Sequence, residues 1–245
     1  MDDVLKKQTQ EVLTKAQNIL IAVSTSSGFD GLASGLALYL SIQKLNKNLA
    51  LIAKNPTVKD AQMLYGVNKI GTADGKKDLI ISISKAVENV DKVTHFLDGD
   101  ELKIVIHALQ GSKGVEPQDI FFKKAASKPN TVIAIGYENF TQLKNDITQD
   151  HTIYSDDFII SVNFIETREK FAQINIHEHE AVCLSEVCAN LIEDLAIPID
   201  PDIAFNLYTG MSQATQMFSP NITKPSTLDA AQFVLEFGAG NARLA

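Results

Sequence analysis

ILIAVSTSSGFDGLASGLALYL, residues 19–40, is the stretch around which the chain is organised. It opens with an apolar run at 19–23 that is short enough to be a buried strand. A small polar turn at 24–31 follows, and apolar residues then recur at helical spacing. Such a turn places backbone N–H groups and hydroxyls at a helix N-terminus, a common place to hold an anion or a metal-bound phosphate. An ordinary strand-to-helix connection has the same pattern, so this stretch alone leaves both interpretations open.

The composition of the 245 residues, 45% hydrophobic and 21% charged, is typical of a globular protein. No run of 18 apolar residues is present, and residues 1–17 lack the apolar segment of a signal peptide, so we expect no membrane association. A net charge of -8 argues against broad electrostatic binding of nucleic acid.

The two cysteines, Cys183 and Cys188, lie five residues apart in a predicted helix. That spacing puts the two side chains on different faces of the helix, which argues against a disulfide. A reduced thiol pair is typical of a cytoplasmic protein, which is the localisation we expect.

Strands and helices alternate in the first part of the chain, which predicts a parallel sheet with right-handed crossovers. The pattern predicts helices at 2–17, 31–45, 58–65 and 139–146, and strands at 19–23, 49–53, 131–135 and 158–162. Three further helices follow, at 181–195, from 200 to about 210, and at 226–238.

The middle of the chain interrupts this alternation. A strand is predicted at 79–83, and two strands at 92–97 and 102–109 flank an Asp-Gly turn. Residues 117–126 are expected to form a short helix. We therefore predict one α/β domain, 1–245, with a mainly parallel sheet flanked by helices, a β-hairpin insertion at about 92–109 and a helical last third.

Three segments, 19–40, 159–175 and 199–218, together resemble the catalytic domain of the DHH phosphoesterases. That superfamily includes RecJ-like exonucleases, nanoRNases, cyclic-dinucleotide phosphodiesterases and manganese-dependent pyrophosphatases. The resemblance covers most of the chain and implies the α/β fold and a tendency to form homodimers. The hairpin is not part of the minimal family pattern, and the chain ends where the family's C-terminal substrate-binding domain would begin, so we expect that domain to be absent.

The metal-ligand positions of the family are mostly replaced. The first family motif, His-x-x-x-Asp-x-Asp, corresponds to Ser24, Gly28 and Asp30, and the Asp-His-His motif corresponds to Asn163, Phe164 and Ile165. A third family motif, Leu-x-Thr-Gly-Ile-x-x-Asp-Thr-x-x-Phe, is similar to residues 207–218, where Ala214 stands at the position of the aspartate. The scaffold positions of these motifs that are still present are Ala33, Ser34, Leu207, Thr209, Gly210, Thr215 and Phe218.

The chemistry that the resemblance implies needs two hard divalent cations held by carboxylates and imidazoles. One remaining aspartate cannot hold such a centre, so we expect no catalytic residues, no cofactor and no hydrolysis by the family mechanism. The first hypothesis is a metal-free module that binds a nucleotide or another phosphate-containing ligand, or a protein, including a second copy. The remnant cleft would comprise Ser24, Ser26, Asp30, Ser34, Asn163 and Thr215.

Two alternatives remain open. An active phosphoesterase with an altered site would hold Mn²⁺ or Mg²⁺ at Asp30, helped by Glu138 or by His177 and His179. A purely structural homodimeric subunit would have its former cleft packed shut. The simpler interpretations are that Asp30 is the N-cap of the helix that begins near residue 31, that the serines satisfy their own turn, and that the two histidines lie in an exposed acidic loop.

Overall fold

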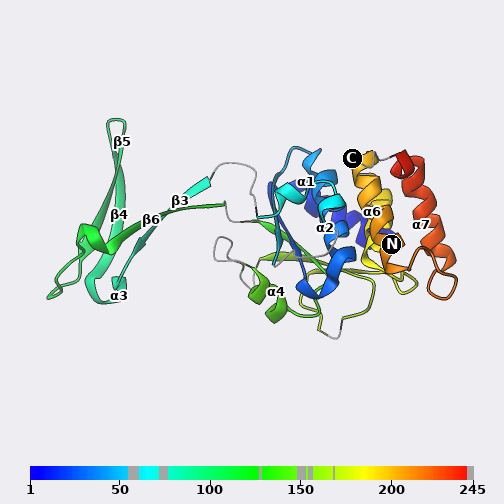
Figure 1. The fold of residues 1–245 in the computed structure, drawn as a ribbon. Helices are drawn as coiled ribbons and strands as arrows, with labels where there is room; N and C mark the ends of the chain where they lie inside the picture. The colour runs from blue at the N-terminus through cyan, green and yellow to red at the C-terminus, as the bar shows by residue number, and fades with distance from the viewer. Residues whose placement is uncertain are drawn as a thin grey trace. The chain divides into compact units, whose positions relative to one another are not determined.

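The structure is a computed structural model that describes residues 1–54, 61–71, 77–126, 129–147, 153, 157–167 and 169–241. The chain divides into two compact units: the body, made of Met1–Gly75 and Ser127–Ala245, and the insertion, Lys76–Ala126 (Figure 1). Sequence analysis predicts one domain interrupted by a hairpin at 92–109. The compact insertion extends beyond that hairpin on both sides.

A five-stranded sheet forms the centre of the body, with the strand order β2-β1-β7-β8-β9. All of its strand pairs are parallel, which confirms the predicted fold class. The last strand is absent from the sequence prediction, because its four residues are too few to show a clear alternation. The strands are β1 (Asn18–Val23), β2 (Asn48–Ala53), β7 (Thr131–Ile135), β8 (Phe158–Asn163) and β9 (Ile174–His177).

The strand order reverses between β1 and β7. From β1 the sheet grows to β2 in one direction, and from β7 it grows to β8 and β9 in the other. In open α/β sheets, the carboxyl ends of the strands at such a reversal are the usual place for a ligand. The turn at 24–27 lies at this point, and the Ser24 N–H donates to the Ile135 carbonyl at 2.9 Å.

Helices cover the two faces of the sheet unequally. Alternate residues of a strand point to opposite faces, so Ile21 packs against the large helical layer and Leu20 against Leu143 of α4 on the other side. The large layer contains α1 (Asp3–Lys15), α2 (Gly28–Gln43), α5 (Leu184–Leu195), α6 (Pro201–Ala214) and α7 (Pro225–Glu236), and the smaller one contains α4 (Phe140–Asp146).

Helix α2 is the central helix of the large layer. Twelve of its sixteen residues are buried, which explains why its sequence is apolar on nearly every side. It packs directly on β1: a Cβ atom added at Gly35 would lie 2.3 Å from a methyl carbon of Val23. The helix begins at Gly28, one turn before the predicted start, because the preceding residues Thr25–Ser27 form a 3-10 turn that leads into it.

The predicted C-terminal helices are confirmed. Helix α6 begins as the sequence indicates, with Pro201 in its first turn and with the Asp200 carboxylate accepting the Ile203 N–H at 3.0 Å. The helix expected at 58–65 begins outside the described residues, and only a 3-10 turn, Ala61–Met63, is seen in the part that is described. No helix in the described part of the chain has the length and apolar character that crossing a bilayer requires.

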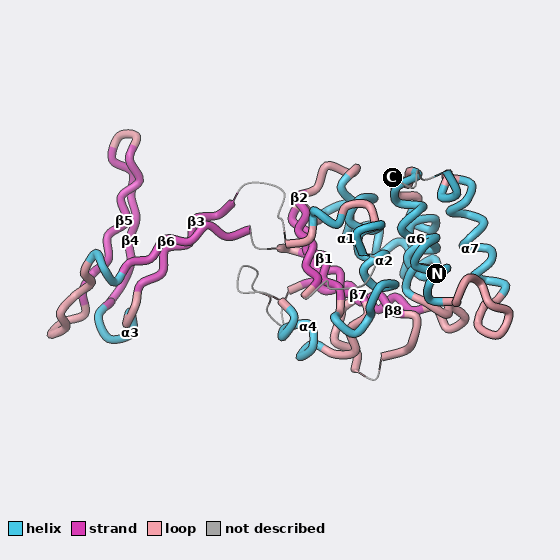
Figure 2. The backbone as a smooth tube through the Cα atoms, viewed as in Figure 1, coloured by secondary structure: helices cyan, strands magenta, loops and turns pink. Residues whose placement is uncertain are grey.

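Two antiparallel ladders make up the insertion (Figure 2). Strands β3 (Lys77–Ile83) and β6 (Ile120–Ala126) pair with each other, and β4 (Val90–Asp98) and β5 (Glu101–Ala108) form the predicted hairpin, preceded by a short helix, α3 (Ala86–Asn89). The helix expected at 117–126 is wrong: only Pro117–Asp119 is a 3-10 turn, and β6 follows it. Its partner strand is distant in the sequence, so local periodicity cannot reveal the pairing.

Candidate functional site

The turn after β1 is satisfied largely by its own polar groups. The Ser24 hydroxyl lies 2.9 Å from the Ser26 hydroxyl and accepts the Ser26 N–H at 3.3 Å. These bonds are the local side-chain-to-backbone contacts that serines commonly make in turns. Two of the three serines of the predicted cleft, Ser24 and Ser26, are therefore engaged within the turn.

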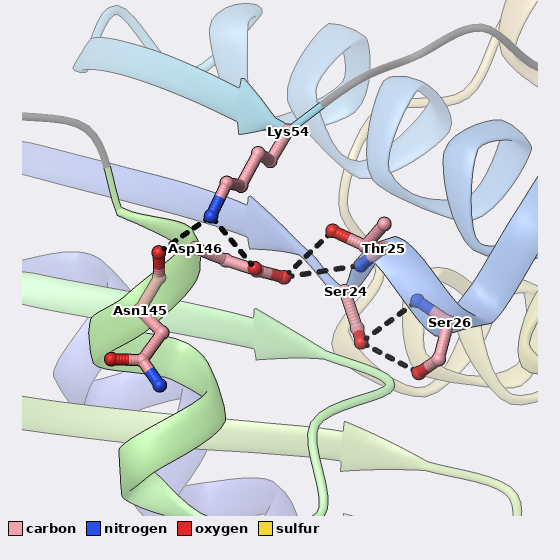
Figure 3. A network of polar contacts seen from close by, with 6 residues as sticks. All are labelled: Ser24, Thr25, Ser26, Lys54, Asn145 and Asp146. Atoms are coloured by element: carbon pink, nitrogen blue, oxygen red, sulfur yellow. Dashed lines mark hydrogen bonds and ion pairs between the residues drawn. The ribbon is translucent and has the colours of Figure 1, made fainter.

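A carboxylate from α4 occupies the outer side of this turn (Figure 3). Asp146 accepts the Thr25 backbone N–H at 3.2 Å and the Thr25 hydroxyl at 2.9 Å. Lys54, just after β2, lies 3.9 Å from the same carboxylate and donates to the Asn145 carbonyl at 3.0 Å. The turn thus holds an anion, as its sequence suggests, but the anion is a side chain of the protein itself.

Asp30 is partly buried, and its carboxylate is bound within the protein. It belongs to the first turn of α2, yet its carboxylate accepts the backbone N–H groups of Leu184 at 2.7 Å and Ser185 at 2.9 Å. These are the first two residues of α5. The prediction that Asp30 is the N-cap of its own helix is wrong, because Ser27 precedes α2 and makes no side-chain cap; Asp30 instead caps α5.

Burial raises the pKa of the Asp30 carboxyl, and the nearby Glu186 adds to this, while the bonds from Ser185 and Leu184 oppose it. Both carboxylate oxygens already accept a backbone N–H group. A metal ion at Asp30 would therefore share the carboxylate with the bonds that cap the start of α5.

Ser34 also belongs to this junction between helices. Its side chain is fully buried, donates to the Asp30 carbonyl at 2.7 Å and lies 3.1 Å from the Ser185 hydroxyl. Helix α6 crosses closely here, because a Cβ atom at Gly210 would lie 2.0 Å from the Ser185 oxygen and 3.0 Å from the Ala33 Cβ atom. Ser34 and Gly210 therefore lie where three helices, α2, α5 and α6, meet.

Thr215 closes the end of α6. Its side chain is fully buried, its hydroxyl donates to the Met211 carbonyl at 2.7 Å, and it accepts the Phe218 N–H at 3.0 Å. These contacts stabilise the chain as it leaves the helix with Gln216, Met217 and Phe218 in the left-handed region. The hydroxyl therefore serves the helix end and not a cleft.

A cavity of ≈ 90 Å³ lies at the carboxyl ends of β8 and β9, and it contains the remaining predicted position, Asn163. Asn163 is 5% exposed and its amide donates to the Tyr137 carbonyl at 2.8 Å. The volume accommodates several waters or one small polar group. The lining residues are Ser161, Asn163, Ile165, Glu166, Thr167, Lys170, Asn175, Ile176 and His177.

Asn175 supplies the clearest unmet polar group of this cavity. Its amide nitrogen donates to the Ala172 carbonyl at 2.8 Å, which fixes the orientation of the amide. Its carbonyl oxygen is buried and has no hydrogen-bond partner within the described residues. A buried acceptor of this kind needs a donor from a water or a ligand. In the sequence, Asn175 stands out only as the last residue of the segment 159–175 that resembles the DHH phosphoesterases. No pattern in the sequence indicates that its carbonyl oxygen would need a hydrogen-bond donor.

Among the described residues, few ionisable side chains line the cavity. Glu166, Lys170 and His177 line it, and all three side chains are exposed. His179 and Glu138, the other candidates for an altered metal site, are exposed and do not line it. In the described part of the chain, no group of three or more His, Cys, Asp or Glu side chains is arranged to hold a metal ion.

The buried acid Glu186 joins α5 to α7. Its carboxylate accepts the Val182 N–H at 3.0 Å, the Ser226 hydroxyl at 2.7 Å and the Thr227 hydroxyl at 2.9 Å. The residue is fully buried, and charged groups are tolerated there only with such partners. Sequence analysis does not identify this role, because residues 226–227 are distant in the chain.

Comparison with known proteins supports the fold alone. No protein-family model matches the sequence, and no curated protein matches it. Among solved structures, the chain is similar to an exopolyphosphatase-related protein from Bacteroides fragilis, with a TM-score of 0.62 and 14% sequence identity. The match covers 97% of this chain and 57% of the other, so the chain spans less than two thirds of that protein's length. At this identity, the similarity establishes a shared α/β fold.

Proposed function

We propose that this protein has a phosphoesterase-like fold and acts by binding, holding a small phosphate-containing ligand such as a nucleotide without hydrolysing it. The proposed site is the cavity at the ends of β8 and β9, whose volume of ≈ 90 Å³ takes one polar group of the ligand while the rest of the ligand lies outside it. The observation that carries the proposal is the buried carbonyl oxygen of Asn175, which has no hydrogen-bond partner among the described residues and belongs to a residue that lines a cavity together with Asn163 and Lys170.

The chemistry of the cavity fits a ligand with both a donor and a negative charge. Asn175 requires a hydrogen-bond donor, which an amino or hydroxyl group of a nucleotide supplies. Lys170 at the cavity can attract a phosphate, and its exposed position allows its flexible side chain to adapt and to hold the phosphate away from Glu166, which also lines the cavity. Carboxyl ends of strands are the usual ligand edge of an open α/β sheet.

The strand reversal between β1 and β7 is the more usual ligand position, and its contacts explain why we place the site elsewhere. There, Asp146 already binds Thr25 and lies beside Lys54. A phosphate would have to compete with this carboxylate, so the cavity at β8 and β9 is the better candidate.

The side chains at the family motif positions support a non-hydrolytic role. A two-metal centre needs several carboxylates and imidazoles close together. Ser24 is bonded within its turn, and Asp30 caps α5 with both oxygens. Phe164 packs against the core, and Ile165 is 52% exposed, so this apolar pair supplies no ligand.

A thermal-shift titration tests the proposal, using inorganic phosphate, nucleoside monophosphates and Mn²⁺ separately. A ligand selective for the folded state raises its stability by about 2.7 kcal/mol at a hundred times its Kd. We expect a nucleotide to raise the melting temperature, the rise to be lost in Lys170→Ala and Asn175→Ala, and the rise to persist in Lys7→Ala, a control lysine on α1.

Product analysis of the same mixtures tests the absence of hydrolysis. We expect the nucleotide to be recovered intact, with or without Mn²⁺. Manganese-dependent hydrolysis by the wild type that His177→Ala abolishes would contradict the proposal and favour the altered-site enzyme. Absence of any shift with phosphate or nucleotides would contradict the binding role.

A further inference from the structure

An open apolar groove of ≈ 560 Å³ lies between α6 and α7, which run side by side in the body (Figure 1). We call its five apolar lining residues the apolar groove: Tyr208, Phe218, Leu228, Ala231 and Leu235. Leu228 and Leu235 lie two turns apart on one side of α7, and they are 53% and 45% exposed. Apolar side chains gathered in this way on a surface mark a site of contact with another molecule.

Aromatic rings make up one side of the groove. The rings of Tyr208 and Phe218 pack with their centroids 5.4 Å apart, at an angle of 41°. Phe218 is the last of three successive residues in the left-handed region, after Gln216 and Met217. Side chains rarely adopt this conformation, and it persists where the surrounding structure holds it, often at binding sites. Here it brings Phe218 into the groove and leaves Met217 80% exposed.

Carboxylates border the groove along the outer side of α7. Gln232 and Glu236 line the groove, and they also line a polar recess of ≈ 290 Å³ between α5 and α7. Glu193 and Asp229 lie at the same recess. All three acidic side chains are exposed, and none forms an ion pair with another described residue. The apolar surface and the free carboxylates are therefore adjacent.

The helices around the groove are acidic as a group. Residues 184–236, which include α5, α6 and α7, contain seven acidic residues, and Lys224 is the only basic residue among them. Lys224 lies 3.2 Å from the Glu180 carboxylate, which reduces its effect on a partner. This segment thus carries most of the net charge of -8 of the whole chain, and it attracts positively charged molecules.

We propose that the apolar groove binds a basic amphipathic helix of another protein. The apolar side chains of that helix lie in the groove, and its lysines or arginines lie against the carboxylates of α5 and α7. Binding of an amphipathic helix in a groove between helices is a common mode of recognition, with anchor residues at i, i+3, i+4 and i+7. The proposal does not depend on the proposed ligand site, because no residue of the apolar groove lines the cavity at β8 and β9.

The charge around the groove selects this partner over three others. An anionic membrane surface or a nucleic acid would meet the exposed carboxylates Glu193, Asp229 and Glu236 with charge of the same sign. A second copy of this chain, docked groove to groove, would bring two such sets of carboxylates together, and juxtaposed like charges oppose association. A basic helix satisfies both the apolar groove and its acidic border.

Fluorescence anisotropy of the full chain with a labelled synthetic peptide tests the proposal. The peptide is a helix with leucines at i, i+3, i+4 and i+7 and with lysines and alanines elsewhere. We expect saturable binding that weakens as salt is added. A peptide of the same composition in scrambled order, and one with glutamates in place of the lysines, should each bind at least about tenfold more weakly. No binding of the basic helix, or equal binding of the scrambled peptide, would overturn the proposal.

Variants of the chain locate the binding on the groove. Leu228→Gln/Leu235→Gln keeps the charge and should weaken binding at least about tenfold, whereas Val4→Gln, 68% exposed on α1, is the matched control and should not. Both leucines are exposed, so the helices should remain folded, which circular dichroism checks. Binding that survives the double leucine variant would place the peptide elsewhere and overturn the proposal.

A charge variant and two further measurements identify the occupant. Glu193→Gln/Asp229→Asn/Glu236→Gln should weaken binding of the basic helix and reduce its salt dependence, whereas Glu11→Gln on α1 should do neither. Sedimentation equilibrium should show no dimer that Leu228→Gln/Leu235→Gln dissociates. Such a dimer would identify a second copy as the occupant, and binding to anionic vesicles lost in the same variant would identify a membrane; either result would overturn the proposal.

Discussion

The carboxylate of Asp30 accepts the backbone N–H of Leu184 at 2.7 Å, although 154 residues separate the two in the chain. This bond places a carboxylate from the start of α2 at the N-terminus of α5, where a helix has unpaired N–H groups and a positive end of its dipole. The same aspartate is the one metal-ligand type of residue in the segment that resembles the first DHH motif. Its observed partners make it a structural cap between helices.

Replacing Asp30 should reduce stability. Asp30→Ala leaves the N–H groups of Leu184 and Ser185 buried without an acceptor, so we expect a loss of roughly 2–4 kcal/mol in the free energy of unfolding. Asp30→Asn keeps one acceptor and should cost less. Urea denaturation measures the change, and Glu11→Ala, an exposed helix position, is the control expected to change little. Equal losses for Asp30→Ala and Glu11→Ala would contradict the capping role.

The pH dependence of stability should also change in Asp30→Asn. Burial raises the pKa of Asp30 in the folded state above its unfolded value. The contribution of Asp30 to the free energy of unfolding is therefore fully present below the pKa that Asp30 has in the unfolded chain. This contribution is lost as the pH rises through the pKa that Asp30 has in the folded protein. Subtracting the Asp30→Asn unfolding free energies from those of the wild type should give a difference that decreases with rising pH. A difference that increases over this range would refute the assignment.

Glu186 should be coupled energetically to α7. Glu186→Ala removes the acceptor for the Thr227 hydroxyl, the Ser226 hydroxyl and the Val182 N–H, and we expect a loss of roughly 2–4 kcal/mol. In a double-mutant cycle with Thr227→Val, the coupling energy should be about 0.5–3 kcal/mol. Pairing Glu186→Ala with the exposed α7 change Gln232→Ala should give a coupling near zero, and a similar value for both pairs would argue against a specific link.

Asp146→Ala should make the turn after β1 available to an external anion. The variant removes the acceptor for the Thr25 N–H and hydroxyl and frees Lys54 from its carboxylate neighbour. A phosphate or sulfate ion can then take its place at the turn. Isothermal titration with sulfate should detect binding to Asp146→Ala that Asp146→Ala/Lys54→Ala loses. Sulfate binding of equal strength in the wild type would show that the carboxylate does not block the turn.

Gly210→Ala should destabilise the packing of α6 on α2 and α5. An added Cβ atom would lie 2.0 Å from the Ser185 oxygen and 3.0 Å from Ala33, both in well-packed surroundings. Overpacking of this kind costs about 1–3 kcal/mol. Thermal unfolding should show the loss, and Gly210→Ala/Ser185→Ala should recover part of it. No recovery in the double variant would mean that the contact with Ser185 is not the cause.

Local patterns in the sequence were sufficient for the body of the fold. Apolar runs bounded by polar turns correctly predicted the strands at 19–23, 49–53, 131–135 and 158–162, because buried parallel strands are short and continuously apolar. Helical periodicity and the Asp200-Pro201 pair correctly predicted the C-terminal helices. An Asp-Gly turn correctly predicted the hairpin in the insertion.

Contacts between distant segments were decided only by the tertiary structure. No local pattern shows that Asp30 caps α5, that Asp146 occupies the turn after β1, or that β6 pairs with β3. Side-chain periodicity reports which face of an element is apolar, whereas the partner of a polar group depends on how the elements pack. The sequence by itself therefore determined the α/β layers, and the three-dimensional packing decided which polar residues support the fold and which line the cavity.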